Sequence, residues 1–281
     1  MVGIDAERAR RLLRAQFPQW SHLPVTDVAE QGWDNRTFRL GDAMKLRLPS
    51  AARYASQAAK EARWLPVLAP HLPVDVPEVI AVGRPGDGYA WPWSVQTWLE
   101  GKPAHTESAN VDFARDVAAF LVTLRGIESS GGPEAGEHSF HRGGALKVYH
   151  GEARAAADTL RGEINTARAL AVWDEALASR WNDAPVWVHG DVAAGNLLAR
   201  DGRLCGVIDF GCMAMGDPAC DLVLAWTLFE GEARGVFQRD VLLDAATWSR
   251  ARGWALWKAM ITLAADRGNS AALRVIGDLL D

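Results

Sequence analysis

Residues 188 to 211 decide the fold of this chain. They begin with Val188-His189-Gly190-Asp191-Val192-Ala193-Ala194-Gly195-Asn196 and end with Val207-Ile208-Asp209-Phe210-Gly211. A short apolar run leads into each piece, Val186–Val188 into the first and Leu204–Ile208 into the second. Turn residues and a strand end would explain either piece by itself. Both pieces together, with Asp209 eighteen positions after Asp191, indicate a functional site.

The spacing of these polar residues is the one that kinase catalytic loops use for phosphoryl transfer to a hydroxyl group. In such loops one Asp orients the acceptor hydroxyl, while an Asn and a second Asp hold magnesium. Mg²⁺ prefers oxygen ligands and keeps several waters, so one carboxylate, one amide oxygen and the nucleotide phosphates are enough to bind it. The pattern therefore predicts an Mg²⁺-dependent phosphotransferase.

The triplet His189-Gly190-Asp191 resembles the catalytic loop of the aminoglycoside phosphotransferase-type small-molecule kinases. These enzymes share the protein-kinase-like fold but carry His-Gly-Asp where protein kinases carry His-Arg-Asp. The resemblance extends from the strand pair around Gly32 to Gly216-Asp217-Pro218-Ala219-Cys220-Asp221-Leu222. It implies that Asp191 is the catalytic base and that Asn196 and Asp209 bind Mg²⁺.

The resemblance also implies a role for Asp221 as a buried brace that accepts backbone N–H bonds from the catalytic loop. A second interpretation is that Asp221 is an acidic residue in the first turn of a helix that starts at Pro218. The two interpretations do not exclude each other.

The first hundred residues read as a small β-rich lobe. Short strand candidates lie at Val25–Glu30, Arg36–Leu40, Ala43–Leu48, Glu78–Val82 and Trp93–Leu99. An N-terminal helix capped by Asp5 and closed by Pro18 precedes them, and an Ala-rich helix follows the third strand, at least up to Pro66. We therefore expect an antiparallel sheet with one main helix.

The remaining chain is mostly helical in pattern. Helices are expected over Asp112–Arg125, Gly151–Leu160, Glu163–Trp181, Pro218–Phe229 and the Trp248–Leu280 region. Residues 126–144 hold six glycines in nineteen positions and are expected to form a long loop. The predicted fold class is α+β and, by the resemblance, protein-kinase-like and bilobal. Residues 1–100 would be the nucleotide-binding lobe and residues 101–281 the helical lobe for catalysis and acceptor binding.

A nucleotide clamp should lie in the first lobe. Lys45, inside the third strand, could reach the nucleotide phosphates, and Arg47 shares its face of the strand by period two. The family pattern, rather than the spacing, favours Lys45. Kinases fix this lysine with a helix glutamate, and Glu61 is the one acidic residue between Ser50 and Val74. The alternative is that Glu61 forms an ordinary ion pair with Lys60 on the surface of the helix.

Two further segments complete the expected nucleotide site. The loop Gln31-Gly32-Trp33-Asp34-Asn35 has one glycine where protein kinases have three, and it resembles the shorter phosphate loop of the small-molecule kinases. Gly32 and Asn35 are its candidate phosphate contacts, although a plain hairpin turn explains the same residues. Gln96 and Trp98 lie in the expected hinge, whose backbone would read the purine edge. Side chains there do not separate ATP from GTP.

The net charge of the chain is mildly negative, so a nucleic acid or an anionic membrane would have to bind locally. Thirty Lys and Arg against thirty-five Asp and Glu leave a formal charge of −5, which gives no footprint for nucleic acid or an anionic membrane. No apolar run is long enough for a signal peptide or a bilayer span. The cysteines, Cys205, Cys212 and Cys220, lack the paired spacing of a zinc site. We expect a cytoplasmic protein with reduced thiols.

The acceptor is less well defined by the sequence. Residues 1–100 carry a formal charge of +1 and residues 102–281 one of −6. The acidic residues that follow the expected metal site, Asp217, Asp221, Glu230 and Glu232, favour a cationic acceptor. With the family resemblance, this makes an aminoglycoside the first expectation. The sequence carries no signal for whether antibiotic resistance is the biological role. Because such an acidic excess is ordinary, macrolides, amino alcohols and sugars remain alternatives.

Two other functional classes fit the sequence less well. A protein kinase is disfavoured by Gly190 and by the six residues between Gly211 and Pro218, which leave little room for an activation loop. A non-catalytic, kinase-like nucleotide-binding module is disfavoured because every expected site residue is present, namely Lys45, Glu61, Asp191, Asn196 and Asp209. The sequence carries no signal for the oligomeric state.

Overall fold

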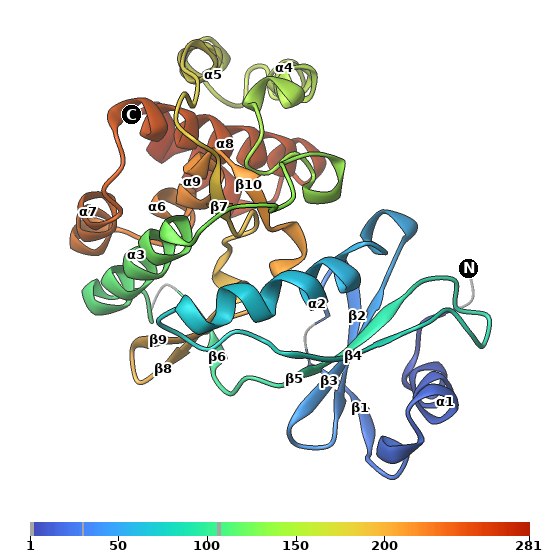
Figure 1. The fold of residues 1–281 in the computed structure, drawn as a ribbon. Helices are drawn as coiled ribbons and strands as arrows, with labels where there is room; N and C mark the ends of the chain where they lie inside the picture. Colours follow the sequence, from blue (N-terminus) through green and yellow to red (C-terminus); the bar gives the residue numbers. More distant parts are fainter. Residues whose placement is uncertain (1–2, 30, 106–107) are drawn as a thin grey trace. The chain divides into compact units, whose positions relative to one another are not determined.

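The computed structural model describes residues 3–29, 31–105 and 108–281. The chain divides into two compact units. The first contains Met1–Gly101 and Gly206–Gly211, and the second contains Lys102–Cys205 and Cys212–Asp281. The first is built on an antiparallel sheet and the second is mainly helical (Figure 1). This confirms the α+β class predicted from the sequence.

The first unit contains a five-stranded sheet in the order β1-β2-β3-β5-β4, with every neighbouring pair antiparallel. Its strands are β1 (Val25–Asp27), β2 (Asn35–Leu40), β3 (Met44–Pro49), β4 (Val79–Gly83) and β5 (Trp93–Thr97). Each of the five sequence-predicted strands therefore exists. The expected strand Val25–Glu30 ends earlier, at Asp27, and Glu30 itself lies outside the described residues.

The two faces of this sheet have different chemistry, because successive side chains of a strand point to opposite sides. Leu46 and Leu48 of β3 belong to an apolar cluster with Leu12 and Leu13 of helix α1 (Ala6–Gln16). Lys45 and Arg47, at the alternate positions, are also buried but point away from that cluster. The sheet therefore has one apolar face and one face with buried cations.

Helices α1 and α2 (Gln57–Leu68) are the helices of eight or more residues in the described part of the first unit. Asp5 caps α1 as predicted, accepting from the Arg8 N–H at 2.8 Å. The helix expected up to at least Pro66 is α2, which continues two residues further, to Leu68. The proline removes one N–H donor near the last turn, while the Ala69 N–H still donates to Leu65 and closes the helix.

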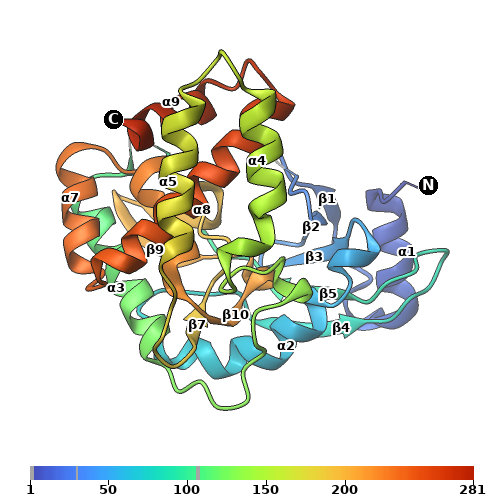
Figure 2. The ribbon, with the colours of Figure 1, turned by 90° about the horizontal axis from the view of Figure 1, so that it is seen from above.

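The second unit is organised around its longest helix, α8 (Ala245–Ala265), which packs against α4, α5 and α9 (Figure 2). Large apolar side chains of α8 are buried, among them Trp254, Leu256 and Met260. The other helices are α3 (Val111–Gly126), α4 (His150–Thr159), α5 (Thr166–Ala178), α6 (Leu224–Thr227), α7 (Gly231–Asp240) and α9 (Ser270–Leu280).

Two small sheets carry the catalytic-loop segment. Strand β7 (Val186–Val188) pairs antiparallel with β10 (Ala214–Gly216). A three-stranded sheet contains β6 (Lys102–Pro103), β8 (Leu197–Arg200) and β9 (Arg203–Val207). The apolar runs expected before the two motifs are β7 and β9.

Several helical expectations in this unit were incomplete. The segment predicted as one helix over Pro218–Phe229 is a 3₁₀ turn, Pro218–Leu222, followed by the single turn of α6. The Trp248–Leu280 region is two helices, because α8 ends at Ala265 and Asn269 caps α9 by accepting from the Ala272 N–H. Helix α7, with its Gly- and Arg-containing sequence, was not predicted, nor were the short strands β8 and β10.

The glycine-rich segment 126–144 is irregular, as expected, apart from a 3₁₀ turn at Glu137–Ser139. It is fastened to β10, since the Met215 N–H donates to Pro133 and the Met215 carbonyl accepts from Ala135. Its end is packed closely as well: a side chain on Gly216 would lie 2.0 Å from the carbonyl oxygen of Gly143. The loop is therefore a fixed part of the second unit.

Within the described ranges, none of the helices is both long enough and apolar enough to cross a membrane.

Candidate active site

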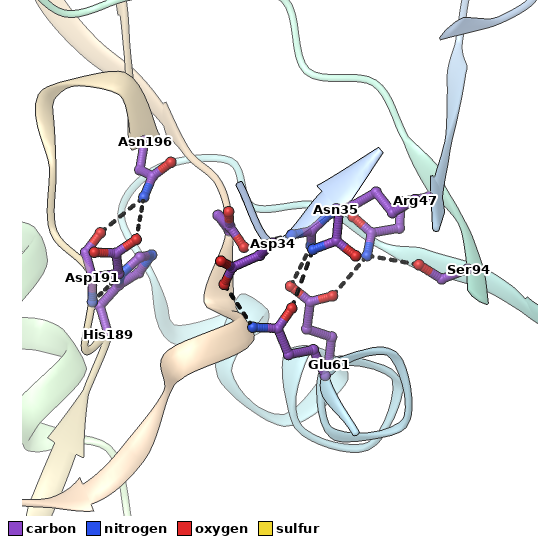
Figure 3. A network of polar contacts seen from close by, with 11 residues as sticks. Asp34, Asn35, Arg47, Glu61, Ser94, His189, Asp191 and Asn196 are labelled. Carbon is purple, nitrogen blue, oxygen red and sulfur yellow. Dashed lines mark hydrogen bonds and ion pairs between the residues drawn. The ribbon is translucent and has the colours of Figure 1, made fainter. Parts of the chain in front are cut away.

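The catalytic-loop residues of the second unit are gathered directly after β7. The Asp191 N–H donates to Nδ1 of His189 at 3.2 Å. Asn196 donates through Nδ2 to the Asp191 carbonyl at 2.9 Å and to its Oδ2 at 3.3 Å (Figure 3). The five-residue spacing seen in the sequence thus places an amide beside the carboxylate. Because Nδ2 is committed to Asp191, Oδ1 is the atom of Asn196 that remains to bind a cation.

Asp221 holds the backbone of this loop through its carboxylate. Its Oδ2 accepts from the His189 N–H at 2.7 Å, and its Oδ1 accepts from the Gly190 N–H at 2.8 Å. The side chain is buried, and burial raises the pKa of this carboxyl, with the His189 ring and these two N–H groups opposing the rise. Asp221 is therefore the brace that the sequence predicted, and it acts by holding the loop backbone.

Gly190 is required by the backbone of the loop. Its φ is +81°, in the region that favours glycine. A Cβ at this position would lie 2.4 Å from the carbonyl oxygen of Cys212. The loop therefore has no room for the larger residue that protein kinases carry between the His and the Asp.

A second cluster of charged residues lies in the first unit, around Arg47 of β3. Arg47 donates through Nη1 to Oε1 of Glu61 at 2.6 Å (Figure 3). It also donates through Nη2 to Oδ1 of Asp209 at 2.5 Å. Arg47 and Glu61 are buried. Burial disfavours the charge of Arg47, but Asp209 and Glu61 outweigh it and raise the pKa of the guanidinium.

The partner of Glu61 is thus not the lysine that the sequence analysis favoured. Lys45 forms no ion pair with any carboxylate of a described residue, although it lies on the same face of β3 and is 6% exposed. Burial lowers the pKa of Lys45 to about 8, with the charge of Arg47 adding to this and Glu61 and Asp209 opposing it. Arginine occupies the pairing position because its planar fork reaches two carboxylates at once.

Asp209 lies within the Gly206–Gly211 segment, which belongs to the first unit. The Val207 N–H donates to the Asp75 carbonyl at 2.9 Å and ties this segment down. Asp209 has a φ of +65°, a left-handed conformation that Asp tolerates better than most residues. Its side chain is 29% exposed, so one carboxylate receives Arg47 while keeping access to solvent.

In the expected phosphate loop, the side chain of Asn35 is directed to Gln57. The Asn35 side chain is buried and donates to Gln57 Oε1 at 3.1 Å, and Gln57 Nε2 donates to Asp34 Oδ2 at 3.0 Å. Gly32 has an open neighbourhood, with the nearest atom 3.8 Å from a Cβ placed there. Trp33, which the sequence analysis did not single out, is 92% exposed.

The expected hinge residues are part of β5 or follow it directly. Gln96 is fully buried, donates to Glu61 Oε2 at 2.9 Å, and has an Oε1 with no hydrogen-bond partner among the described residues. The Trp98 N–H donates to the Ala43 carbonyl, and the Arg39 guanidinium lies 4.0 Å from the centre of the Trp98 ring. Gln96 thus supports Glu61, and the backbone N–H of Trp98 is committed within the sheet.

A cavity of about 300 Å³ in the second unit includes Asp191 in its lining. The catalytic loop, the loop residue Arg142 and residues of α8 and α9 form its walls. A larger cavity of about 610 Å³ in the same unit is lined by Asp217, Arg250 and Trp181 among others and does not include Asp191. The smaller cavity has the size of a small-molecule site and the catalytic-loop carboxylate in its wall.

Comparison with solved structures identifies the fold. The GDP complex of wild-type aminoglycoside 2′-phosphotransferase-IIIa matches with a TM-score of 0.72 at 17% identity, over 99% of each chain. The streptomycin–ATP ternary complex of APH(2″)-IIa matches with a TM-score of 0.64 at 20% identity, over 100% of this chain and 97% of that one. These matches confirm the kinase-like fold.

A macrolide 2′-phosphotransferase from Brachybacterium faecium is similar to the same degree, with a TM-score of 0.63 at 20% identity over 98% of this chain and 97% of that one. A search of curated protein sequences finds no match to this chain. The model of the phosphotransferase enzyme family matches residues 26–254, which is most of the chain. The protein, a small-molecule kinase, therefore belongs to the phosphotransferase enzyme family.

Proposed function

We propose that this protein transfers the γ-phosphoryl group of ATP or GTP to a hydroxyl group of a small molecule, with Mg²⁺. The observation that carries this proposal is the position of Asp191, which lines a cavity of about 300 Å³ while Asn196 and His189 hold its backbone and side chain. A carboxylate fixed beside a cavity of this size can orient a hydroxyl group and accept its proton.

The transfer is a direct displacement at phosphorus. The acceptor oxygen forms a bond to the γ-phosphorus, and the bond from this phosphorus to the β,γ-bridging oxygen breaks, which leaves the nucleoside diphosphate. The hydroxyl proton passes to Asp191. Alignment of the reactants and electrostatic stabilisation supply most of the rate, so no covalent phosphoenzyme is needed.

Asp209 and Asn196 are the proposed Mg²⁺ ligands. They offer a carboxylate and an amide oxygen, the donor types that Mg²⁺ prefers. No group of three or more His, Cys, Asp or Glu side chains that could hold a metal occurs in the described ranges. Mg²⁺ usually keeps several waters, and the nucleotide phosphates would supply its other ligands. When bound, Mg²⁺ would neutralise phosphate charge during the transfer.

The first unit supplies the proposed nucleotide site. We assign the positive charges of Arg47 and Lys45 to the phosphates. Glu61 accepts a hydrogen bond from Arg47, and Gln96 holds Glu61 in place by donating to its other carboxylate oxygen. Gly32 and the exposed Trp33 would cover the nucleotide, while Asn35 supports this loop through Gln57. Backbone groups around Trp98 would read the purine edge. Similar structures carry GDP in one case and ATP in another, which supports either donor.

The acceptor classes supported by the names of the similar proteins are aminoglycosides and macrolides. Streptomycin and gentamicin occur in structures of APH(2″)-IIa, and kanamycin occurs in a related complex. Phosphorylation of such a compound by this protein would give antibiotic resistance as its role. Amino alcohols and sugars are the remaining alternatives.

The test compares the wild-type chain with Asp191→Asn for nucleotide binding and nucleoside diphosphate release. Asp174→Asn, an exposed carboxylate of α5, is the matched control. We expect Asp191→Asn to keep its affinity for Mg-nucleotide and to lose turnover by at least about a hundredfold. Full activity in this variant would contradict the role of Asp191. Nucleotide binding by the wild type without turnover of any acceptor or of water would favour the non-catalytic alternative.

A further inference from the structure

The cavity beside Asp191 has a charge opposite to that of the surrounding chain. Its charged lining residues besides Asp191 are Arg142, Lys258 and Arg274, and Asp191 is its one acidic residue in the described ranges. Residues 102–281 as a whole carry a formal charge of −6. The class of acceptor that this site binds depends on the local charge rather than on that total.

Arg142 contributes a positive charge that no described carboxylate neutralises. Its guanidinium lies 5.1 Å from the ring centre of Trp254 and 4.9 Å from that of Trp257. Aromatic faces stabilise a cation and hold its orientation without cancelling its charge. The residue belongs to the glycine-rich segment 126–144, which its contacts with β10 fasten in place. Arg142 is therefore a fixed cation in the wall of the cavity.

Lys258 contributes a second charge of this kind. It lies on α8 one turn after Trp254, so both side chains share a face of the helix. It is exposed and forms no ion pair with a described carboxylate. Arg274 differs, because its Nη1 lies 3.4 Å from Glu230 and 3.7 Å from Asp278. Arg142 and Lys258 are the two uncompensated cations of the cavity.

The acidic residues that favoured a cationic acceptor in the sequence are used elsewhere. Asp217 forms a buried ion pair with Arg250 at 2.6 Å. Asp221 holds the catalytic-loop backbone, and Glu230 faces Arg274. None of these three lines the cavity. Glu232 does not line the cavity either, so these carboxylates add no negative charge to its wall.

The remaining lining of the cavity is partly apolar. Val192, Val223, Ala259 and Val275 give it apolar walls. The first turn of α9, with Ala271 and Ala272, also lines it, and the N-terminal end of a helix adds positive potential. An occupant needs an apolar part as well as a polar one.

We infer that the acceptor carries, besides its reacting hydroxyl, an anionic group such as a carboxylate or a phosphate, and an apolar portion. Arg142 and Lys258 bind the anionic group, and Asp191 receives the hydroxyl. A polycation would place its charges against two unpaired cations and is disfavoured. This inference rests on the proposed function and narrows its acceptor to a class that differs from the sequence-based expectation.

The experiment uses acceptors matched in everything except charge. Gluconate, gluconamide and glucamine form one set, and tropate, tropamide and 3-amino-2-phenylpropan-1-ol form a more apolar set. Glucitol 6-phosphate beside glucitol tests phosphate as the anion, and kanamycin is the polycationic reference. Binding is measured by calorimetry in the presence of Mg-ADP, and transfer is measured by nucleoside diphosphate release.

We expect the anionic member of at least one set to exceed its neutral partner about tenfold in affinity or kcat/KM, with the amine weakest. Arg142→Gln and Lys258→Gln should each reduce severalfold the ratio of kcat/KM for the anionic acceptor to kcat/KM for its neutral partner. Arg154→Gln on α4, an exposed arginine outside the cavity, should change nothing. Because Lys258 is exposed, its substitution tests the inference even if the Arg142 variant folds poorly.

The inference would be overturned if the protein preferred the amines or kanamycin as acceptors. It would also be overturned if no anionic compound bound more tightly than its neutral partner. A third contrary result would be an Arg142 variant that lost affinity for Mg-ATP and not for the acceptor. Mg²⁺-dependent nucleotide binding and slow hydrolysis by the wild type are measured on the same preparation. Their absence would count against the proposed function itself, so the two failures are distinguishable.

Discussion

Arg47 holds the carboxylate of Asp209 through a contact of 2.5 Å between Nη2 and Oδ1. The same guanidinium donates to Glu61, so one arginine joins strand β3, helix α2 and the Gly206–Gly211 segment that contains Asp209. A lysine ammonium is a single point charge and does not offer this planar, two-sided geometry. Asp209, the proposed Mg²⁺ ligand, is therefore positioned beside a cation that stays charged at every physiological pH.

Replacing Arg47 should affect both folding and nucleotide binding. Arg47→Met leaves Glu61 buried without its cation, which should lower the free energy of unfolding by about 3–5 kcal/mol. Arg47→Lys keeps the positive charge but not the planar guanidinium, so the free energy of unfolding should fall by less than in Arg47→Met. Urea unfolding and calorimetric binding of Mg-ATP are the measurements. Arg36→Met, an exposed position of β2, is the control. If Arg47→Met unfolded at the same urea concentration as the wild type, the ion pairs of Arg47 with Glu61 and Asp209 would not stabilise the fold.

The pKa of Lys45 makes stability depend on pH. The folded chain releases this proton near pH 8, whereas an unfolded lysine keeps it to its ordinary pKa of 10.5. Between these values the unfolded state binds more protons, so the free energy of unfolding should rise with pH. Lys45→Met should be more stable than the wild type at pH 7 and should lack this rise. Lys102→Met, an exposed position, should retain it.

The same proton should control nucleotide affinity if Lys45 binds phosphate. The charged form is needed for binding, so the affinity for Mg-ATP should fall as the pH rises through about 8. The Lys45→Met variant should bind Mg-ATP more weakly than the wild type, and its affinity should not change as the pH rises through about 8. An unchanged profile in the variant would remove Lys45 from the nucleotide site.

Gly190 should not tolerate a side chain. Gly190→Ala forces a φ of +81° on a residue with a Cβ and brings that Cβ against the Cys212 carbonyl. Backbone strain alone should cost about 1–3 kcal/mol of stability, and the displaced Asp191 should lose turnover. Thermal unfolding and kcat are measured together with Gly235→Ala in α7, where no atom lies within 4 Å. Equal stability of the two variants would rule out the steric explanation.

Asp221 should act through the position of the loop. Asp221→Asn can accept one N–H bond with its carbonyl oxygen but not both, so one buried N–H loses its partner at a cost of about 1–3 kcal/mol. We expect a fall in kcat with a nearly unchanged KM for the nucleotide, because the loop carries Asp191. Asp183→Asn, an exposed carboxylate, serves as the control. A change confined to the KM for the nucleotide would indicate a different role.

Residues with a local signal were predicted well from the sequence. The apolar runs before His189 and Asp209 became β7 and β9, and the Asp5 cap began α1 where expected. The shortest elements were missed, since β8 and β10 are four and three residues long and have no periodicity to detect. The Ala-rich composition favoured a helix at least up to Pro66, and the burial of Leu65 and Leu68 accompanies its continuation to Leu68.

The partners of charged groups depended on contacts between distant segments. The sequence showed that Lys45 and Arg47 share a face of β3, but not which of them meets Glu61. That outcome depends on where α2 lies over the sheet and on the fork of the guanidinium. Likewise, Arg142 is separated from Lys258 by more than a hundred residues, and no spacing rule joins a loop to a helix over that length.

The sequence by itself determined the α+β class, the catalytic-loop motif and the candidate roles of Asp191, Asn196 and Asp209, because each depends on residues close together in the chain. Tertiary structure decided that Arg47 takes the place beside Glu61, that Gly190 lies against Cys212, and that the cavity at Asp191 is positively charged. A net charge is a sum over the whole chain, whereas a binding site is affected by the few charges that folding brings to it and leaves unpaired.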